Sequence, residues 1–160
     1  MHQSSETTPT TPEQLLVERF YYQGWNKADD RVMHQVLDAN VEFRGSFRRK
    51  PLRGIPAFCA YMHQAHAALA RNRVQIQDVV VSDNGGGRGG IQKAAVRTRN
   101  RGVHRGEFFG VPGSGHEVTW TAAAFFTLHA SKITEIWVLG DMDGLKHQIG
   151  ASAGAPAFDG

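Results

Sequence analysis

The hydrophobic pattern of the chain changes its period near residue 70. Before that point apolar residues recur at helical spacing, most clearly from Phe58 to Leu69. After it, alternating and β-branched segments at 74–81, 91–100, 118–128 and 132–139 predict four strands. Short connections favour antiparallel neighbours, and helices gathered on one face of a sheet define an α+β architecture. We therefore predict a strongly curved antiparallel sheet that about three helices close into a cone with an internal pocket.

Three segments carry helix signals, and a short strand lies between the second and the third. Thr11 can cap a helix that begins with a proline, and Asp29 or Asp30 can cap the next one. A Gly-Ile-Pro run at 54–56 opens the third helix, and residues 41–46 predict the short strand. The expected order is therefore two helices, a strand, a helix and then four strands.

The length of 160 residues fits one domain, which we place at residues 12–150 between flexible tails at 1–11 and 151–160. A hydrophobic fraction of 41% and a single cysteine, Cys59, indicate a globular protein without an internal disulfide. No apolar run reaches the roughly 18 to 20 residues of a membrane span, and the start is polar. We expect a cytoplasmic protein with no membrane partner.

The net charge of +3 is too small to indicate nucleic-acid binding. Arg97, Arg99 and Arg101 alternate along one predicted strand, but a sheet edge or a dimer rim explains them as well, so we expect no nucleic-acid partner. His63 and His66 are three residues apart on a predicted helix, with no third ligand at a recognisable spacing. We therefore predict no metal site.

The carboxyl half of the chain resembles the SnoaL-like polyketide cyclase family, in the nuclear-transport-factor-two-like superfamily of α+β cone folds. The matching residues are the run 103–112 (VHRGEFFGVP), Ser114, Gly115, the run 133–137 (ITEIW), Asp141, Leu145 and the run 148–150 (QIG). Residues 43–45, Gly54 and Phe58 match the amino half more loosely. The family's cyclases carry a histidine and a glutamine on the preceding strand, where this sequence has Thr127 and Phe125.

The resemblance implies a cofactor-free enzyme of secondary metabolism that closes a polyketide-like carbonyl compound by an intramolecular aldol reaction. Asp141 matches the family's acid/base residue, and desolvation at the end of an apolar strand would raise its pKa. Arg44 or His104 would stabilise the oxyanion. The resemblance further implies a hydrophobic substrate, a homodimer formed through the open face of the sheet, and a pocket lined by Trp25, Phe43, Phe58, Met62, Trp120, Phe125 and Trp137.

Each candidate residue also has a purely structural interpretation. Asp141 can cap a last helical turn, Arg44 can pair with Glu42, and His104 can shape a turn through backbone hydrogen bonds. Aromatic residues at such spacings are more often plain core than pocket lining. Two further functions therefore stay open: an isomerase or rearrangement catalyst for a terpenoid or alkaloid intermediate that relies on Arg44, and a small-molecule binding module without catalysis.

Overall fold

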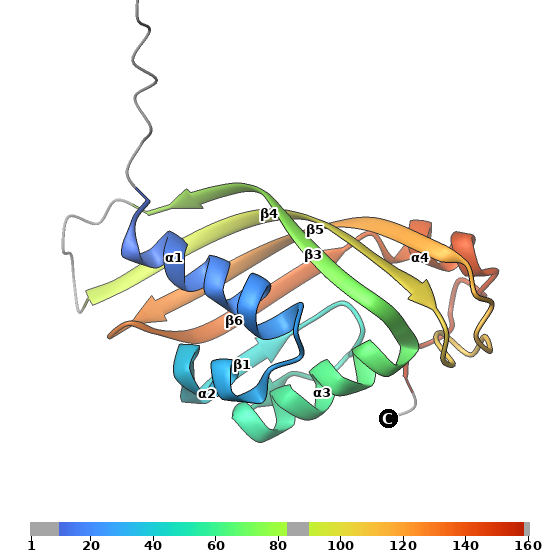
Figure 1. Ribbon diagram of the computed structural model, residues 1–160, viewed down its shortest axis with the longest axis horizontal. Coiled ribbons are helices and arrows are strands. Elements are labelled where there is room, and N and C mark those ends of the chain that lie inside the picture. The colour runs from blue at the N-terminus through green and yellow to red at the C-terminus, as the bar shows by residue number, and fades with distance from the viewer. Residues whose placement is uncertain (1–9, 83–89, 159–160) are drawn as a thin grey trace, which may run out of the picture.

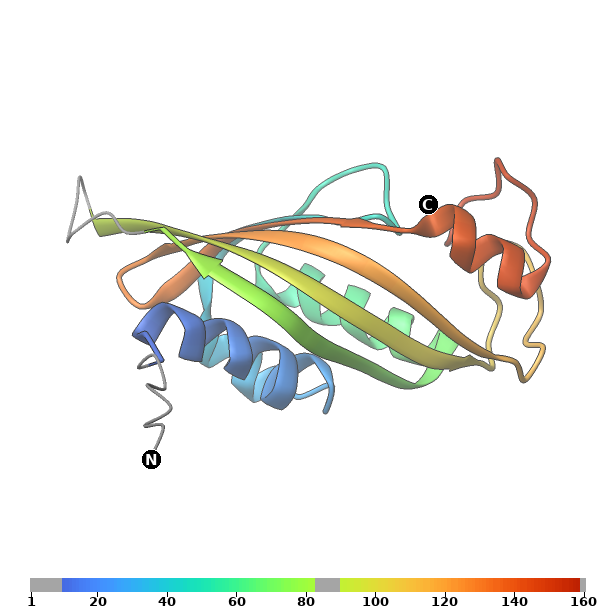
Figure 2. The same cartoon turned by 90° about the horizontal axis from the view of Figure 1, so that it is seen from above.

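A six-stranded, strongly curved sheet forms the frame of the protein in the computed structural model, which describes residues 10–82 and 90–158 (Figures 1 and 2). The strand order is β2-β1-β6-β5-β4-β3. The bounds are β1 Leu37–Arg44, β2 Leu52–Arg53, β3 Leu69–Val81, β4 Ile91–His104, β5 Glu117–His129 and β6 Lys132–Gly140. The α+β class and the four long strands after residue 68 are as predicted, and the glycine-rich turn at 85–90 lies largely outside the described residues.

The sheet is mixed, which corrects the expectation of a purely antiparallel one. β3, β4, β5 and β6 follow one another as antiparallel neighbours, but β1 lies parallel to β6, with Phe43 opposite Ile136. A short turn forces two strands to run antiparallel, whereas a long connection leaves their direction open. Since most of the chain lies between β1 and β6 in the sequence, the sequence pattern does not determine the direction of β1 relative to β6.

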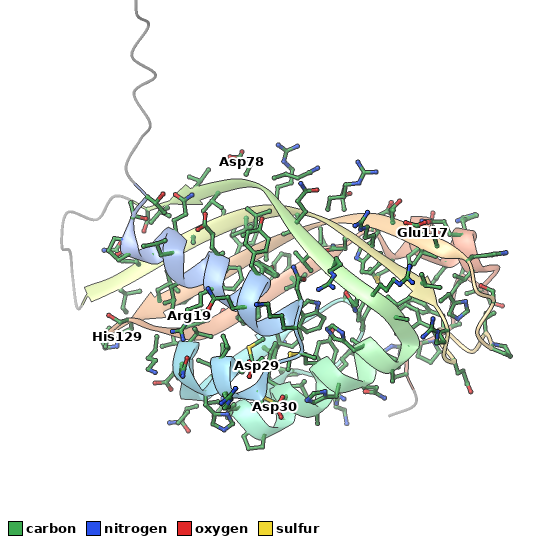
Figure 3. The ribbon with its side chains drawn as sticks, viewed as in Figure 1. Arg19, Asp29, Asp30, Asp78, Glu117 and His129 are labelled. Atoms are coloured by element: carbon green, nitrogen blue, oxygen red, sulfur yellow. The ribbon has the colours of Figure 1, made fainter. Side chains whose placement is uncertain are left out.

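Helices cover the concave face of the sheet, as the view from above shows (Figure 2). They are α1 Pro12–Glu18, which continues as the π-helix Arg19–Trp25, then α2 Asp30–Val36 and α3 Ile55–Ala68. The Thr11 hydroxyl accepts a hydrogen bond from the Gln14 amide, and Asp29 caps α2 (Figure 3). These helix starts are as predicted. In the described residues, no helix combines the length and the apolar composition needed to cross a membrane.

A fourth helix, α4 Met142–Ile149, and the segment after it close one end of the cone. Residues 151–158 were expected to form a loose tail, yet they pack against the domain. The Ala157 carbonyl accepts a hydrogen bond from the Phe109 amide, and the Phe158 ring lies 5.4 Å from that of Phe108. The burial of Ala157 and the ring contact of Phe158 attach this segment to the domain.

Candidate functional site

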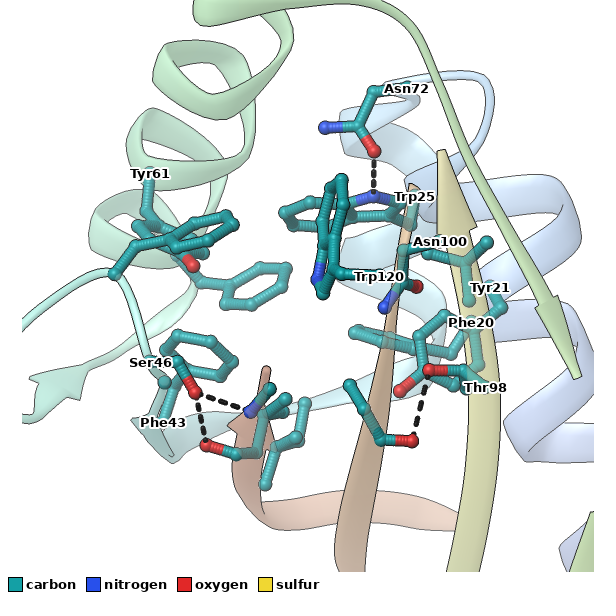
Figure 4. A pocket seen from close by; sticks show the side chains of 18 of the residues that line it. Phe20, Tyr21, Trp25, Phe43, Ser46, Tyr61, Asn72, Thr98, Asn100 and Trp120 are labelled. Carbon is teal, nitrogen blue, oxygen red and sulfur yellow. Dashed lines mark hydrogen bonds between the residues drawn. The ribbon is translucent and has the colours of Figure 1, made fainter. Parts of the chain in front are cut away.

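An apolar pocket lies between the concave face of the sheet and the helices, with a cavity volume of about 70 Å³ (Figure 4). Its walls come from the π-helix, α3, the start of α4, the strands β1, β3, β4, β5 and β6, and the loop after β1. Its lining residues are Phe20, Tyr21, Trp25, Phe43, Gly45, Ser46, Phe47, Phe58, Tyr61, Asn72, Val74, Thr98, Asn100, Trp120, Ala122, Ile136, Val138, Gly140 and Met142. An apolar hollow with a few converging polar groups is the usual form of a small-molecule site.

Asn72 faces this pocket because of a bulge in β3. Ala70 pairs with Val103 and Arg73 pairs with Arg101, so two residues of β3 stand opposite Gly102 alone. Arg71 takes up the extra length with a positive φ of 51°, an uncommon conformation for a residue with a side chain. The bulge shifts the alternation by one position, so Asn72 and Val74 point inward where a regular strand starting at Leu69 would place the arginines at 71 and 73.

The Asn72 side chain is 2% exposed and only half of its amide is satisfied. Its Oδ1 accepts a hydrogen bond of 3.3 Å from the Trp25 ring nitrogen, as Figure 4 shows. Its Nδ2 has no partner among the described residues. A buried donor without an acceptor costs about 1 to 3 kcal/mol, so a ligand that supplies an acceptor oxygen would recover that energy.

Other polar groups of the pocket are also available to a ligand. Asn100, which is 5% exposed, makes no side-chain hydrogen bond to another described residue, and neither do the hydroxyls of Tyr21 and Tyr61. Burial raises the pKa of both tyrosines well above the usual range, so they remain protonated donors. By contrast, the Thr98 hydroxyl is directed to the Ala122 carbonyl, at 3.4 Å.

The pocket wall is electrically neutral. Within the described chain, no residue that lines it is an aspartate, glutamate, histidine, lysine or arginine. The wall can therefore orient and polarise a neutral ligand, but it holds no group that exchanges protons readily at neutral pH.

A two-point hydrogen bond holds the π-helix against β3. Asn26, at the end of the π-helix, donates its amide nitrogen to the Val74 carbonyl at 2.9 Å, and its amide oxygen accepts from the Val74 amide at 2.8 Å.

Four of the seven predicted lining residues, Trp25, Phe43, Phe58 and Trp120, line the pocket. Met62 is fully buried in the core but does not belong to the lining. Phe125 and Trp137 are 52% and 39% exposed on the opposite face of the sheet, so their predicted place is wrong. On β5 the inward residues are the even-numbered ones from Val118 to Leu128, and a regular strand cannot turn Phe125 to the same side.

Asp141 is exposed, which corrects the expectation that burial desolvates it. Along β6, Ile136, Val138 and Gly140 face the pocket, so the alternation directs Asp141 away from it. Its Oδ1 instead accepts a hydrogen bond of 2.9 Å from the Gly144 amide and caps α4. This is the structural interpretation of Asp141 that the sequence left open, and its catalytic role stays a prediction.

Replacing Asp141 tests whether capping is its main task. Asp141→Ala removes the cap and should lower the free energy of unfolding by about 1 kcal/mol, whereas Asp141→Asn, which caps equally well, should leave it unchanged. Urea unfolding followed by circular dichroism measures both. If the asparagine variant destabilised the fold as much as the alanine variant, the carboxylate charge rather than the cap would be what matters.

Arg44 and His104 also lie outside the pocket. Arg44 points to the outer face, where its guanidinium is 3.5 Å from the Glu42 carboxylate. His104 is fully buried beneath the loop 105–116. Its Nδ1 lies 2.9 Å from the Ser114 hydroxyl and accepts a bond from the Ser114 amide, and its Nε2 lies 3.1 Å from the Val111 carbonyl. Since a carbonyl only accepts, Nε2 donates this hydrogen bond, and the ring links Val111 to Ser114 across the loop.

The paired histidines of α3 serve different neighbours. His63 Nε2 lies 2.7 Å from Asp30 Oδ1, while His66 packs against the Trp25 ring and burial lowers its pKa.

Burial and the nearby Asp30 carboxylate raise the pKa of the Cys59 thiol to about 11, so it remains protonated at neutral pH. In the described residues, no three histidine, cysteine or acidic side chains gather into a possible metal site.

Comparison with known protein families shows to which family the chain belongs. The sequence pattern of SnoaL-like polyketide cyclases matches residues 15–149, which is nearly the whole described chain. The chain belongs to the SnoaL-like polyketide cyclase family. No curated protein matches its sequence.

Solved structures share the fold at low sequence identity. A protein from Jannaschia sp. CCS1, named as a SnoaL-like polyketide cyclase, has a TM-score of 0.76 at 22% identity, with 91% of this chain and 96% of that chain covered. IdmH from Streptomyces antibioticus, named as a polyketide cyclase, has a TM-score of 0.72 at 19% identity, with 88% and 99% covered. A protein from Catenulispora acidiphila DSM 44928 with a ketosteroid isomerase-like fold, in complex with trimethylamine, has a TM-score of 0.71 at 13% identity, with 90% and 97% covered.

Three of the pocket's polar residues were not among those singled out from the sequence: Asn72, Thr98 and Asn100. The alternation of β4 contains the signal for two of them, because arginines at 97, 99 and 101 on the outer face place Thr98 and Asn100 inward. Asn72 has no such signal, since only the bulge brings it to the inner face.

Proposed function

We propose that this SnoaL-like family member is a cofactor-independent enzyme that closes a ring in an apolar, polyketide-like carbonyl compound by an intramolecular aldol reaction. The observation that carries the proposal is the unpartnered Asn72 Nδ2 inside an aromatic pocket. A carbonyl oxygen of the substrate would accept this hydrogen bond, and the aromatic walls would bury the rest of the molecule.

The neutral wall suggests how the reaction proceeds. The enol form of a dicarbonyl substrate supplies the nucleophilic carbon, which forms the new C–C bond to the second carbonyl carbon. As that C=O π bond breaks, its oxygen gains charge and receives the Asn72 hydrogen bond; the proton leaving the enol hydroxyl ends on the new alcohol. A donor directed at such an oxygen typically contributes about 100- to 1,000-fold in rate. The pocket adds to this rate by holding the enol carbon close to the carbonyl carbon that it attacks.

The second candidate is a binding module without turnover. It is favoured by the lack of an acidic or basic group among the described lining residues. The isomerase that would rely on Arg44 has less support, because that guanidinium is exposed and paired with Glu42. The two leading candidates share the pocket and differ only in whether the product forms faster with the protein than without it.

Calorimetric titration with benzoylacetone and with butylbenzene tests the pocket, because the two differ mainly in the two carbonyl oxygens. We expect the diketone to bind at least tenfold more tightly, the difference that about 1.4 kcal/mol from one well-formed buried hydrogen bond gives. Turnover is then followed with an aryl diketone that can close a six-membered ring. Binding without any acceleration would select the binding module, and equal affinity for diketone and hydrocarbon would reject the site.

We also propose that two copies associate through the outer face of the sheet, where Phe125, Trp137 and Leu139 expose apolar side chains. Sedimentation velocity should give a dimer for the natural protein and a monomer for Phe125→Glu. Leu15→Glu, which adds the same charge at an exposed leucine on α1, is the matched control and should remain a dimer. A natural protein that sediments as a monomer at micromolar concentration would contradict the proposal.

A further inference from the structure

A second hollow of about 560 Å³ adjoins the pocket at the end of the cone closed by α4. It lies between the loop after β1, α4 and the segment 153–158, and we call it the basic groove. Arg48, Arg49, Lys50 and Lys146 line it. No acidic residue in the described chain lines it, and none of these four cations forms an ion pair within residues 10–82 and 90–158.

Two of these cations have donors that no described residue satisfies. The Lys146 Nζ donates to the Ala153 carbonyl at 2.8 Å and lies over the Phe109 ring, 5.1 Å from its centre, which leaves two of its three donors unused. The Arg48 Nε is buried and has no partner among the described residues. A buried charged donor without an acceptor lowers the stability of the fold, so an anion that accepts its hydrogen bond would bind favourably at this end of the protein.

The basic groove and the apolar pocket share a wall, because Ser46, Phe47 and Met142 line both hollows. The pocket alone, at about 70 Å³, is smaller than the roughly 300 to 1,000 Å³ of typical ligand sites. A ligand that extends past Phe47 and Met142 would place its far end among the four cations.

We infer that the basic groove binds an oxyanion, a carboxylate or a phosphate, at one end of the substrate whose apolar part fills the pocket. The inference rests on the proposed function and narrows its substrate to an amphipathic anion. Arginine binds both kinds of oxyanion through paired N–H donors, and the aromatic floor of Phe47 and Phe109 accommodates the carbon atoms next to the charged group.

Calorimetric titration with naphthylacetate, naphthyl phosphate and neutral naphthylacetamide tests the inference, because the three share one apolar ring system. We expect either or both anions to bind about tenfold more tightly than the amide at low salt, and the advantage to shrink as salt is added. The anion that binds more tightly identifies the carboxylate or the phosphate as the natural end group.

The double variant Arg49→Gln/Lys50→Gln changes two exposed side chains that make no side-chain hydrogen bond to a described residue, so it should fold normally. It should lose most of the anion's advantage and keep its affinity for the amide within about twofold. Arg31→Gln, an exposed arginine on α2 outside both hollows, is the matched control and should bind all three compounds as the natural protein does.

The two proposals fail differently in this experiment. If the amide and the anions bind equally and the double variant changes nothing, the basic groove has no role in binding and the pocket proposal stands. If none of the three binds, the pocket itself takes no such ligand and both proposals are rejected. If the anion advantage persists in both the double variant and Arg48→Gln, the anion lies elsewhere and the inference is overturned.

Discussion

Asn72→Leu should weaken the binding of benzoylacetone by about 10- to 100-fold and slow ring closure by about 100- to 1,000-fold. Leucine has the same branched shape and number of heavy atoms as asparagine but offers no donor, so a ligand carbonyl would enter the apolar pocket without a partner. The fold itself should change little in stability. The variant removes the unpartnered Nδ2, which favours folding, but it also deprives the Trp25 ring nitrogen of its acceptor, which opposes it.

Thr98→Val, on the neighbouring strand β4, is the matched control. It has the same shape and also removes a polar group from the pocket, but the Thr98 hydroxyl already bonds to the Ala122 carbonyl. Affinity for the diketone should therefore stay within about twofold of the natural protein, because no ligand bond is lost. Calorimetry on both variants, with melting curves beside it, separates recognition from folding. Undiminished binding by Asn72→Leu would remove the observation on which the proposed function rests.

The sequence predicts the elements of this fold well because their signals are local. Thr11 and Asp29 mark helix starts through their own side chains, and the alternation of β4 and β5 follows directly from the pleat. The direction of β1 cannot be read in the same way. Its partner β6 lies at the far end of the chain, and nothing near residues 37–44 records which way that partner runs.

The site is harder to predict than the fold because it depends on single-residue shifts. One bulge at Arg71 decides that Asn72 rather than its neighbours faces the pocket, and that shift leaves no trace in the hydrophobic pattern. The same sensitivity explains the outcome for Asp141. Gly140 continues the inward row of β6, so the next residue must face outward, where its carboxylate caps α4. Family spacing identifies Asp141 as a candidate but does not determine which way its side chain points.

His104→Ala should lower the free energy of unfolding by about 2 to 4 kcal/mol, a fall in melting temperature of roughly 5 to 15 °C. The change leaves the Val111 carbonyl and the Ser114 hydroxyl without their ring partner and opens a void beside Phe108. The loop has little freedom to close that void. At Gly113 and Gly106 its backbone runs so close to its neighbours that an added Cβ would lie 1.9 Å from the Arg105 carbonyl oxygen and 2.6 Å from that of Ala67.

A structural and a catalytic role for His104 predict different combinations of stability and activity. Because the imidazole lies outside the pocket and both its nitrogens are engaged, benzoylacetone affinity, measured well below the melting temperature, should stay within about twofold for His104→Ala. His116→Ala, which changes an exposed histidine at the end of the same loop, should alter neither property. A His104→Ala protein that melts like the natural one but loses turnover would instead require the ring to reach the substrate. In that case the loop 105–116 would have to open during the reaction, because nothing else could bring a side chain with no exposed surface into the pocket.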